Sequence, residues 1–196
     1  MSELLRDEAE EHEVLSTEIL AQGQLLTLAS DTVDYRGTTI VREFVRHPGA
    51  VAVVALDEEG RVLLIQQYRH PIRTREWEIP AGLLDHPGES LLLAAQRELA
   101  EETELEATRW DVLVDLVASP GGSDELVRVF LARSLRPLVG EFVREAEEAD
   151  IAIRWESIDA VVTGVLDGRL RNGILIAGAL AAAAASSMDW IGLRPA

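Results

Sequence analysis

The stretch that most constrains this chain runs from Gly82 to Leu105 and reads GLLDHPGESLLLAAQRELAEETEL. It opens as a turn rich in glycine and proline, and Ser90 then precedes an apolar pattern that predicts a helix with a serine N-cap. Glu98, Glu101 and Glu102 stand at i, i+3 and i+4, so they share one helix face. Because such carboxylates repel one another by about 0.2–0.5 kcal/mol per pair, this face is either a cation site or a solvated acidic surface.

The composition narrows the range of partners. A chain of 196 residues with a formal net charge of −17 is expected to form one domain, with room for an added arm, and to avoid nucleic acid and anionic lipid. All 18 basic residues are arginine, which excludes Schiff-base lysines and Walker-type phosphate loops. There is no cysteine, no apolar run long enough to span a membrane and no signal-peptide pattern, so a cytoplasmic location is expected.

Residues 1–45 are predicted to form an acidic tail and an antiparallel β arm, ahead of a main domain over residues 46–196. The arm is expected to contain strands at Leu25–Val33 and Thr38–Val45, joined by a turn at residues 34–37 with the sequence DYRG. An arm of this kind often pairs with another subunit.

The main domain is predicted to mix strands and helices. The expected strands are Ala50–Leu56, Arg61–Tyr68, Trp77–Ala81, Trp110–Ala118, Leu126–Leu135 and Ile151–Trp155. Two helices are expected after the first, at Ile158–Leu166 and at about Gly173–Ser186, and the tail from Met188 is predicted to be irregular. This order indicates an α+β, or mixed α/β, domain in which sheet layers lie between helices.

The residues Gly82, Glu89, Arg97-Glu98-Leu99 and Glu101-Glu102 resemble the Nudix box, G-x5-E-x7-R-E-U-x-E-E-x-G-U, in which U is bulky and apolar. The chain departs from this pattern twice, because its first spacer has six residues and its closing glycine is replaced by Glu104. At the position of this closing glycine the helix commonly ends with φ above zero, so a residue other than glycine lowers stability by about 1 kcal/mol.

Two further runs are similar to ADP-ribose pyrophosphatases, namely WEIPAGLLD at residues 77–85 and SPGGSDE at residues 119–125. That subfamily has a proline at a set distance beyond the box, and Pro120 lies 15 residues after Leu105. The resemblance implies Mg²⁺-dependent hydrolysis of ADP-ribose to AMP and ribose 5-phosphate. It also implies an α/β/α sandwich whose N-terminal β arm is exchanged across a homodimer.

The resemblance also implies a set of metal ligands and catalytic residues. The implied ligands of Mg²⁺, or alternatively Mn²⁺, are the Ala81 carbonyl and the carboxylates of Glu89, Glu98, Glu101 and Glu102. Arg97 is implied to orient a box carboxylate, although it is expected to point to a different side of the helix from Glu98. The general base is implied to be Glu147, with Glu148 as second choice and Glu102 as the fallback.

Substrate contacts are expected from residues outside the box. Arg69 ends a strand and offers a bidentate fork to phosphate, although the arginine-rich loop that follows could equally be a solvated surface. Arg46 is a candidate to stack on adenine, within one chain or across the dimer, with Tyr35 or Phe44 as the opposite wall. Glu78 and Pro120 are the remaining candidates, because they lie in the two runs that resemble the subfamily.

Two other functions remain open. The same machinery could cleave another nucleoside-diphosphate sugar, such as GDP-mannose, because only the base pocket would differ. A Nudix-type sensor could bind ADP-ribose without cleaving it, but such proteins typically lose box carboxylates, and Arg97, Glu98, Glu101 and Glu102 are all present. An acidic helix face and a first-turn Glu89 favoured by the helix dipole would also account for some of these residues without any catalytic role.

Overall fold

The computed structural model describes residues 5–138 and 150–196. The chain divides into two compact units: residues up to 47 together with 119–124, called the arm unit, and residues 48–118 together with 125–196, called the main unit.

The arm unit is built on a three-stranded antiparallel sheet in the order β1-β2-β3. Its strands are β1 (Glu13–Gln22), β2 (Thr27–Tyr35) and β3 (Thr38–Arg46). The predicted turn between β2 and β3 is confirmed, because Arg36 and Gly37 have φ values of 55° and 84° and the Gly37 N–H donates to Asp34 Oδ1 at 2.7 Å.

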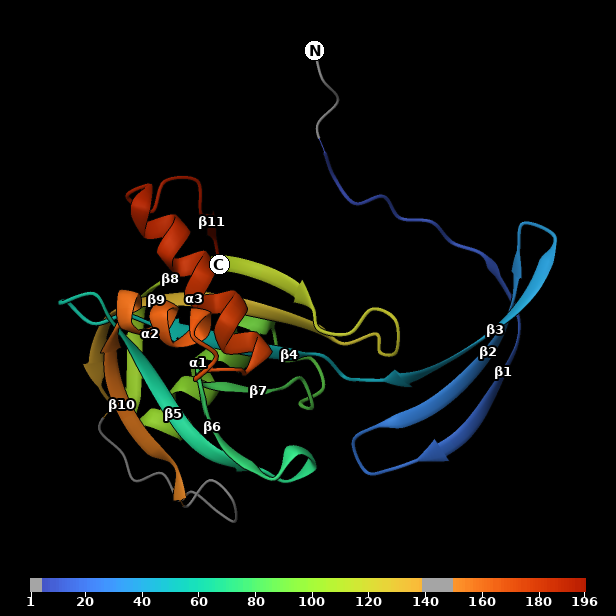
Figure 1. Ribbon diagram of the computed structural model, residues 1–196, viewed down its shortest axis with the longest axis horizontal. Helices are drawn as coiled ribbons and strands as arrows, with labels where there is room; N and C mark the ends of the chain where they lie inside the picture. Colours follow the sequence, from blue (N-terminus) through green and yellow to red (C-terminus); the bar gives the residue numbers. More distant parts are fainter. Residues whose placement is uncertain (1–4, 139–149) are drawn as a thin grey trace. The chain divides into compact units, whose positions relative to one another are not determined.

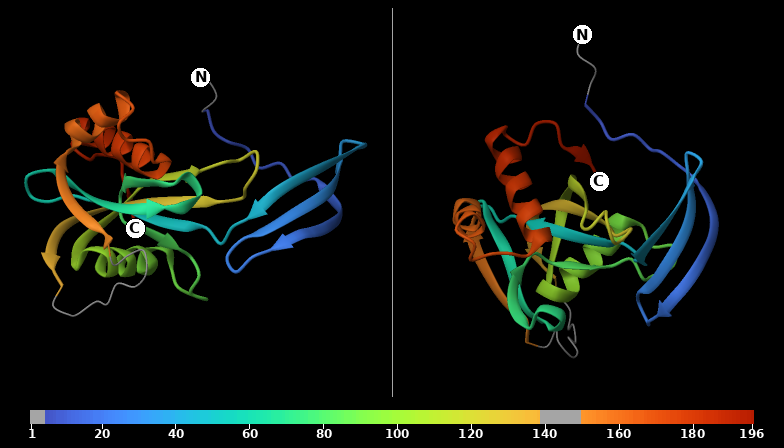
Figure 2. Two further views of the ribbon diagram at one scale, coloured as in Figure 1. Left: turned by 60° about the horizontal axis from the view of Figure 1, so that its bottom comes forward. Right: turned by 45° about the vertical axis from the view of Figure 1, so that its right-hand side comes forward.

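The main unit holds two sheets, ordered β10-β5-β6 and β11-β8-β9-β4-β7. Helix α1 covers one face of the sheets, and α2 and α3 cover the other (Figures 1 and 2). The elements are β4 (Ala50–Ala55), β5 (Arg61–Arg69), the 3₁₀ turn η1 (His70–Ile72), β6 (Thr74–Glu78), β7 (Ala81–Leu83), α1 (Leu91–Thr103), β8 (Leu105–Val117), β9 (Leu126–Pro137), β10 (Ala152–Ser157), α2 (Ile158–Leu166), α3 (Gly173–Ser187) and β11 (Arg194–Pro195).

The centre of the main unit is β4, whose six residues are all buried. It pairs in parallel with β9 and antiparallel with β7. Helices pack against both of its faces. Because strand side chains alternate, Ala52 and Val54 join the core cluster that contains residues of α3, whereas Val51 and Val53 join the cluster that contains residues of α1. This pattern confirms the predicted α+β sandwich.

Helix α1 begins at the serine cap that its sequence predicts, and the structure now locates its end. The Ser90 hydroxyl accepts a hydrogen bond from the Leu93 N–H at 3.3 Å, which satisfies one of the unpaired donors at the helix start. Ala95 and Leu99 are fully buried on its apolar side. Glu104 ends the helix with φ 57° and donates its N–H to the Ala100 carbonyl, so the position that is glycine in the usual box pattern does adopt a left-handed conformation here.

Helix α3 lies close against the sheet because of Gly178. A Cβ at this position would lie 3.0 Å from both Ile79 Cδ1 and Val54 Cγ2, which is tighter than ordinary packing. The Asn172 side chain accepts the Leu175 N–H at 2.9 Å and caps the helix as predicted. Among the described residues, no helix is long and apolar enough to cross a membrane.

Two predicted features of the main unit are wrong. Trp77–Ala81 is not one strand, because β6 ends at Glu78 and β7 begins at Ala81, with Pro80 between them lacking the N–H that a ladder needs. The tail from Met188 is not wholly irregular, since β11 pairs with β8 through Arg194 and Val112.

Candidate active site

A cavity of about 300 Å³ lies in the main unit where strand β7, the turn that follows it, the end of β5 and α1 meet. Six residues predicted for the site line it, and five others join them. They are Arg69, Ala81, Arg97, Glu98, Glu101 and Glu102 from the prediction, with Gln67, Gly82, Leu83, Asp85 and His86.

Gly82 lets the Glu98 carboxylate lie against the backbone of strand β7. A Cβ at position 82 would stand 2.0 Å from both Cδ and Oε1 of Glu98, a separation at which two side chains cannot coexist. The Glu98 side chain is 13% exposed. The carboxylate is therefore held beside the Ala81–Gly82 backbone, which only a residue without a side chain permits.

Glu102 is more deeply placed than the other two box carboxylates. It is 4% exposed, and its Oε2 accepts the Ala81 N–H at 3.0 Å. This hydrogen bond offsets part of the free-energy cost of burying a carboxylate. It also links the end of α1 to strand β7. Glu101 is 44% exposed, so the three glutamates share the cavity but not the same solvation.

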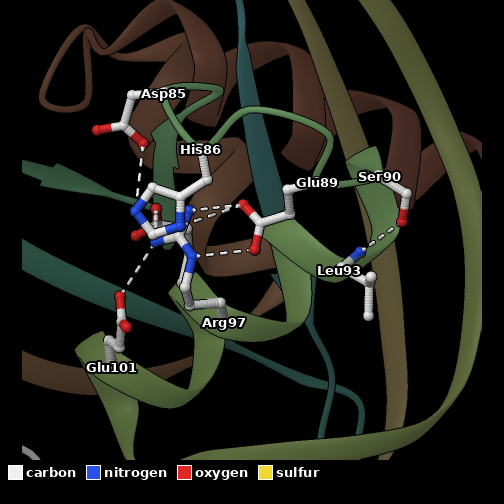
Figure 3. Close-up of polar contacts among 8 residues, drawn as sticks. Asp85, His86, Glu89, Ser90, Leu93, Arg97 and Glu101 are labelled. Carbon is white, nitrogen blue, oxygen red and sulfur yellow. Dashed lines mark hydrogen bonds and ion pairs between the residues drawn. The ribbon is translucent and has the colours of Figure 1, made fainter.

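Arg97 binds three carboxylates at once (Figure 3). Its guanidinium donates to Glu89 through Nε at 3.2 Å and through Nη2 at 3.0 Å, to Glu98 at 2.7 Å and to Glu101 at 3.2 Å. The hydrogen bonds from Arg97 hold the pKa of the Glu89 carboxyl below its usual value. Glu89, in turn, is the largest cause of a raised pKa for Arg97, which Glu98 and Glu101 raise further.

These contacts correct one expectation and support another. Arg97 does not point away from Glu98, because rotation of its long side chain brings the guanidinium beside the neighbouring carboxylate. The arginine also pairs with Glu89 through two nitrogens, as guanidinium and carboxylate groups commonly do, and its predicted orienting role requires contacts of this kind.

Arg69 is held in place by Glu78. The arginine donates to Glu78 through Nε at 2.7 Å and through Nη2 at 2.6 Å, and the Glu78 residue is 3% exposed. Gln67, also buried, donates weakly to the same carboxylate at 3.5 Å. Glu78 therefore lies behind Arg69 as a positioning group, while the arginine side chain, 43% exposed, lines the cavity.

The donor set of this cavity fits a hard divalent cation. Carboxylate oxygens and a backbone carbonyl are the ligands that Mg²⁺ prefers, and the gap left by the missing Cβ of Gly82 brings Glu98 beside the Ala81–Gly82 backbone. In the part of the chain that the structure describes, no three acidic or imidazole groups converge as a ready-made metal site. The Arg97 guanidinium lies among the carboxylates of Glu89, Glu98 and Glu101.

Four cavity residues were not predicted for the site from the sequence, namely Gln67, Leu83, Asp85 and His86. Asp85 and His86 come from the turn between Gly82 and Glu89, and the one available signal was its length, which exceeds the usual box spacing by one residue. His86 Nδ1 lies 3.9 Å from Glu89 Oε2 (Figure 3). Gln67 follows Arg69 into the cavity because residues two apart on a strand face the same side.

The predicted site residues not yet placed belong to the arm unit or lie outside the described residues. Tyr35, Arg46 and Pro120 belong to the arm unit. The two candidate bases, Glu147 and Glu148, lie outside the described residues.

The arm separates two side chains that were expected to face one adenine ring. Tyr35 pairs with Thr38 beside the hairpin turn, whereas Arg46 pairs with Thr27 at the other end of the same strands. Eight residues of strand separate the two positions by about 27 Å. One copy of the arm therefore cannot place both against the same ring, but Phe44 does lie near Arg46, with 5.8 Å between the guanidinium carbon and the ring centroid.

The layered fold, the close approach of Glu98 to Gly82 and the carboxylate-rich helix together define a Nudix-type protein. Residues 46–175 match the NUDIX domain family, and the chain belongs to that family, as predicted.

Individual proteins and one solved structure are also similar to this chain. The chain is 49% identical over 170 residues to an ADP-ribose pyrophosphatase of Mycobacterium tuberculosis, with 86% of this chain and 82% of that protein covered. It is 39% identical over 139 residues to an ADP-ribose pyrophosphatase of Bacillus subtilis, with 70% and 74% covered. A crystal structure of an ADP compounds hydrolase superposes with a TM-score of 0.75, at 22% identity and covering 95% of this chain and 99% of that one, which supports the fold.

Proposed function

We propose that this chain hydrolyses the diphosphate bond of ADP-ribose, giving AMP and ribose 5-phosphate, with Mg²⁺ as its metal ion and Mn²⁺ as an alternative. The observation that carries the proposal is the cavity that brings Arg69 together with the box residues Arg97, Glu98, Glu101 and Glu102. The similarity to two proteins named ADP-ribose pyrophosphatase supports this choice of substrate.

The residues of the cavity are assigned complementary roles. The Ala81 carbonyl and the carboxylates of Glu98, Glu101 and Glu102 would hold the metal ion, with Glu89 supporting them through Arg97. The bound cation would offset the negative charge of the diphosphate and lower the pKa of a bound water. Arg69, which Glu78 binds, is assigned to a phosphate oxygen, because the planar guanidinium fork suits phosphate.

The general base is assigned to Glu147, because Glu102 already accepts a backbone hydrogen bond and is buried. Glu147→Gln is expected to reduce turnover of ADP-ribose about a hundredfold or more while Mn²⁺ binding is kept. Glu58→Gln, in the exposed turn before β5, is the matched control. An unchanged rate for Glu147→Gln would move the base to Glu148 or Glu102.

A homodimer formed through the β arm is the second part of the proposal. Every residue of β1 is exposed, including Val14, Leu15, Ile19 and Leu20, and Ala29 is the single buried hydrophobic residue of the described arm strands. A three-stranded sheet with so little core is not stable by itself, and exposed apolar patches mark association surfaces.

The dimer would also supply the second wall of the adenine site. With Arg46 on one copy and Tyr35 on the other, the distance between these residues within one arm does not prevent both from contacting adenine. Pro120 is kept as a candidate contact to the substrate. Light scattering of the full chain at micromolar concentration should give twice the chain mass, and a monomer would remove both assignments. The predicted cytoplasmic location stays a prediction.

A substrate panel tests the proposed reaction. ADP-ribose, GDP-mannose, ADP-glucose, NADH and diadenosine polyphosphates are each incubated with Mg²⁺ or Mn²⁺, and nucleoside monophosphate release is measured. We expect the highest kcat/KM for ADP-ribose. Preference for GDP-mannose would favour the alternative diphosphatase, whereas ADP-ribose binding without cleavage of any substrate would favour a sensor.

A further inference from the structure

A second cavity, of about 420 Å³, lies in the main unit between the β10-β5-β6 sheet and α2. Its volume falls within the range of small-molecule sites. Apolar walls come from Leu64, Trp77 and Val161, and charged groups come from Arg154, Glu156 and Arg169. None of these residues belongs to the cavity described above.

The second cavity lies on the reverse face of strands that build the candidate active site. In the antiparallel pairing, Leu64 is opposite Arg154 and Gln66 is opposite Trp77, so these side chains share one face. Glu78, next to Trp77, points to the other face, where it binds Arg69.

The lining differs in charge from the rest of the molecule. The chain carries a net charge of −17, yet two arginines and one glutamate line this cavity. Arg154 pairs with Glu156. Arg169 uses its Nε–H for Asp167, at 2.8 Å, and within the described ranges its two terminal NH₂ groups make no hydrogen bond.

The cavity also has a flat apolar surface with a donor attached. The Trp77 indole is partly buried against the core cluster behind α2 and α3. Across residues 5–138 and 150–196, its N–H makes no hydrogen bond, and it is not among the fully buried unpaired atoms. A tryptophan in this state offers both a ring for stacking and an unused donor.

We propose that this cavity is a second ligand site for small organic anions with a flat ring, of the nucleoside monophosphate class. The ring lies against Trp77 and Leu64, and the phosphate is bound by Arg169 and Arg154, whose planar groups suit phosphate oxygens. The small size of Gly164 lets Leu170 and Arg169 pack close to α2. A Cβ added at Gly164 would lie 2.9 Å from Leu170 Cδ1 and 3.7 Å from Arg169 Nη2.

The indole N–H of Trp77 provides a test that does not depend on turnover. Full-length ¹⁵N-labelled protein gives four indole signals, one from each tryptophan, which Trp→Phe variants assign. AMP is added in the presence of EDTA. We expect the Trp77 signal to shift saturably with a Kd of about 1 mM or tighter.

Variants then separate this cavity from the candidate active site. Arg69→Ala should keep the shift, whereas the double variant Arg154→Ala/Arg169→Ala should weaken AMP binding about tenfold or more. Arg171→Ala, an exposed arginine outside the lining, is the matched control and should behave as wild type. Both replaced arginines are more than 60% exposed, and the other three indole signals report whether the variants are folded.

Three results would overturn the proposal. The first is a Trp77 signal that does not move up to about 10 mM AMP. The second is a shift that Arg69→Ala abolishes and the double variant keeps, which would place AMP in the candidate active site. The third is an affinity for ribose 5-phosphate or inorganic phosphate equal to that for AMP, which would show that the flat base of AMP contributes nothing to binding. Because no step requires hydrolysis, failure of this proposal leaves the proposed reaction untouched, and the reverse also holds.

Discussion

Glu98→Gln is expected to lower metal-dependent release of AMP from ADP-ribose about a hundredfold or more, the loss typical when a group that stabilises transition-state charge is removed. Glutamine keeps the size of the side chain but removes its charge, and an amide oxygen is a weaker ligand for Mg²⁺ than a carboxylate. It also replaces the charged partner of the 2.7 Å contact from Arg97. The rate is measured at saturating ADP-ribose and Mg²⁺.

Glu104→Gln is the matched control for Glu98→Gln. It removes the same charge from the end of the same helix, at a residue that does not line the cavity. We expect its rate to stay within about twofold of wild type, as for surface changes of small energetic effect. If Glu98→Gln kept near-wild-type turnover, the assignment of the box carboxylates to the metal would be wrong.

Gly82→Ala is expected to reduce turnover about as much as Glu98→Gln while changing stability little. The new Cβ would stand 2.0 Å from the Glu98 carboxyl carbon, so one of the two groups must move. Gly82 has no positive φ, so alanine fits its backbone conformation, and the group that moves is the end of a flexible side chain. Displacing that carboxylate removes its function at little cost to the fold.

The Gly82→Ala experiment compares kcat with the thermal midpoint of unfolding. Gly173→Ala, at the start of α3, is the control, because a Cβ there meets no atom within 4 Å. In the double variant with Glu98→Gln, the losses should not add, since both changes act through one carboxylate. Additive losses, or a Gly82→Ala variant with normal turnover, would contradict the account of this turn.

Local chemistry made part of this structure predictable. Ser90 and Asn172 cap their helices through their own side chains, and such caps depend on only a few neighbouring residues. The spacing of Glu98, Glu101 and Glu102 likewise placed them together, because the helical repeat determines which residues are neighbours. The end of α1 was less predictable, because Glu104 adopts a φ of 57° at a position where the box pattern has glycine.

Features that depend on distant pairing were not predictable. The short strand at Arg194 forms because it meets Val112 in β8 and because Arg194 also bonds Asp115 at 3.1 Å. Glu78 binds Arg69, and only the pairing of β5 with β6 brings those two side chains together; its predicted contact with substrate stays a prediction. Arg97 reaches its neighbour Glu98 through a side-chain rotation that helix spacing alone does not reveal.

The acidic face of α1 can now be described with its counter-charge. Sequence spacing left a cation site and a solvated surface as alternatives. In the structure, Arg97 bonds two of the carboxylates, Glu98 and Glu101, and the Ala81 N–H bonds the third, Glu102. Metal binding would therefore have to redistribute contacts that already exist, so the affinity of the site for a cation depends on Arg97 as well as on the glutamates.

Binding of Mn²⁺, followed by electron paramagnetic resonance in wild-type protein and in Glu98→Gln, tests the central claim most directly. The account predicts that wild-type protein binds Mn²⁺ and that Glu98→Gln binds it about tenfold or more weakly, with Glu104→Gln unchanged. Equal Mn²⁺ affinity in wild type and Glu98→Gln would contradict it, because the carboxylate beside Gly82 would then not be a metal ligand.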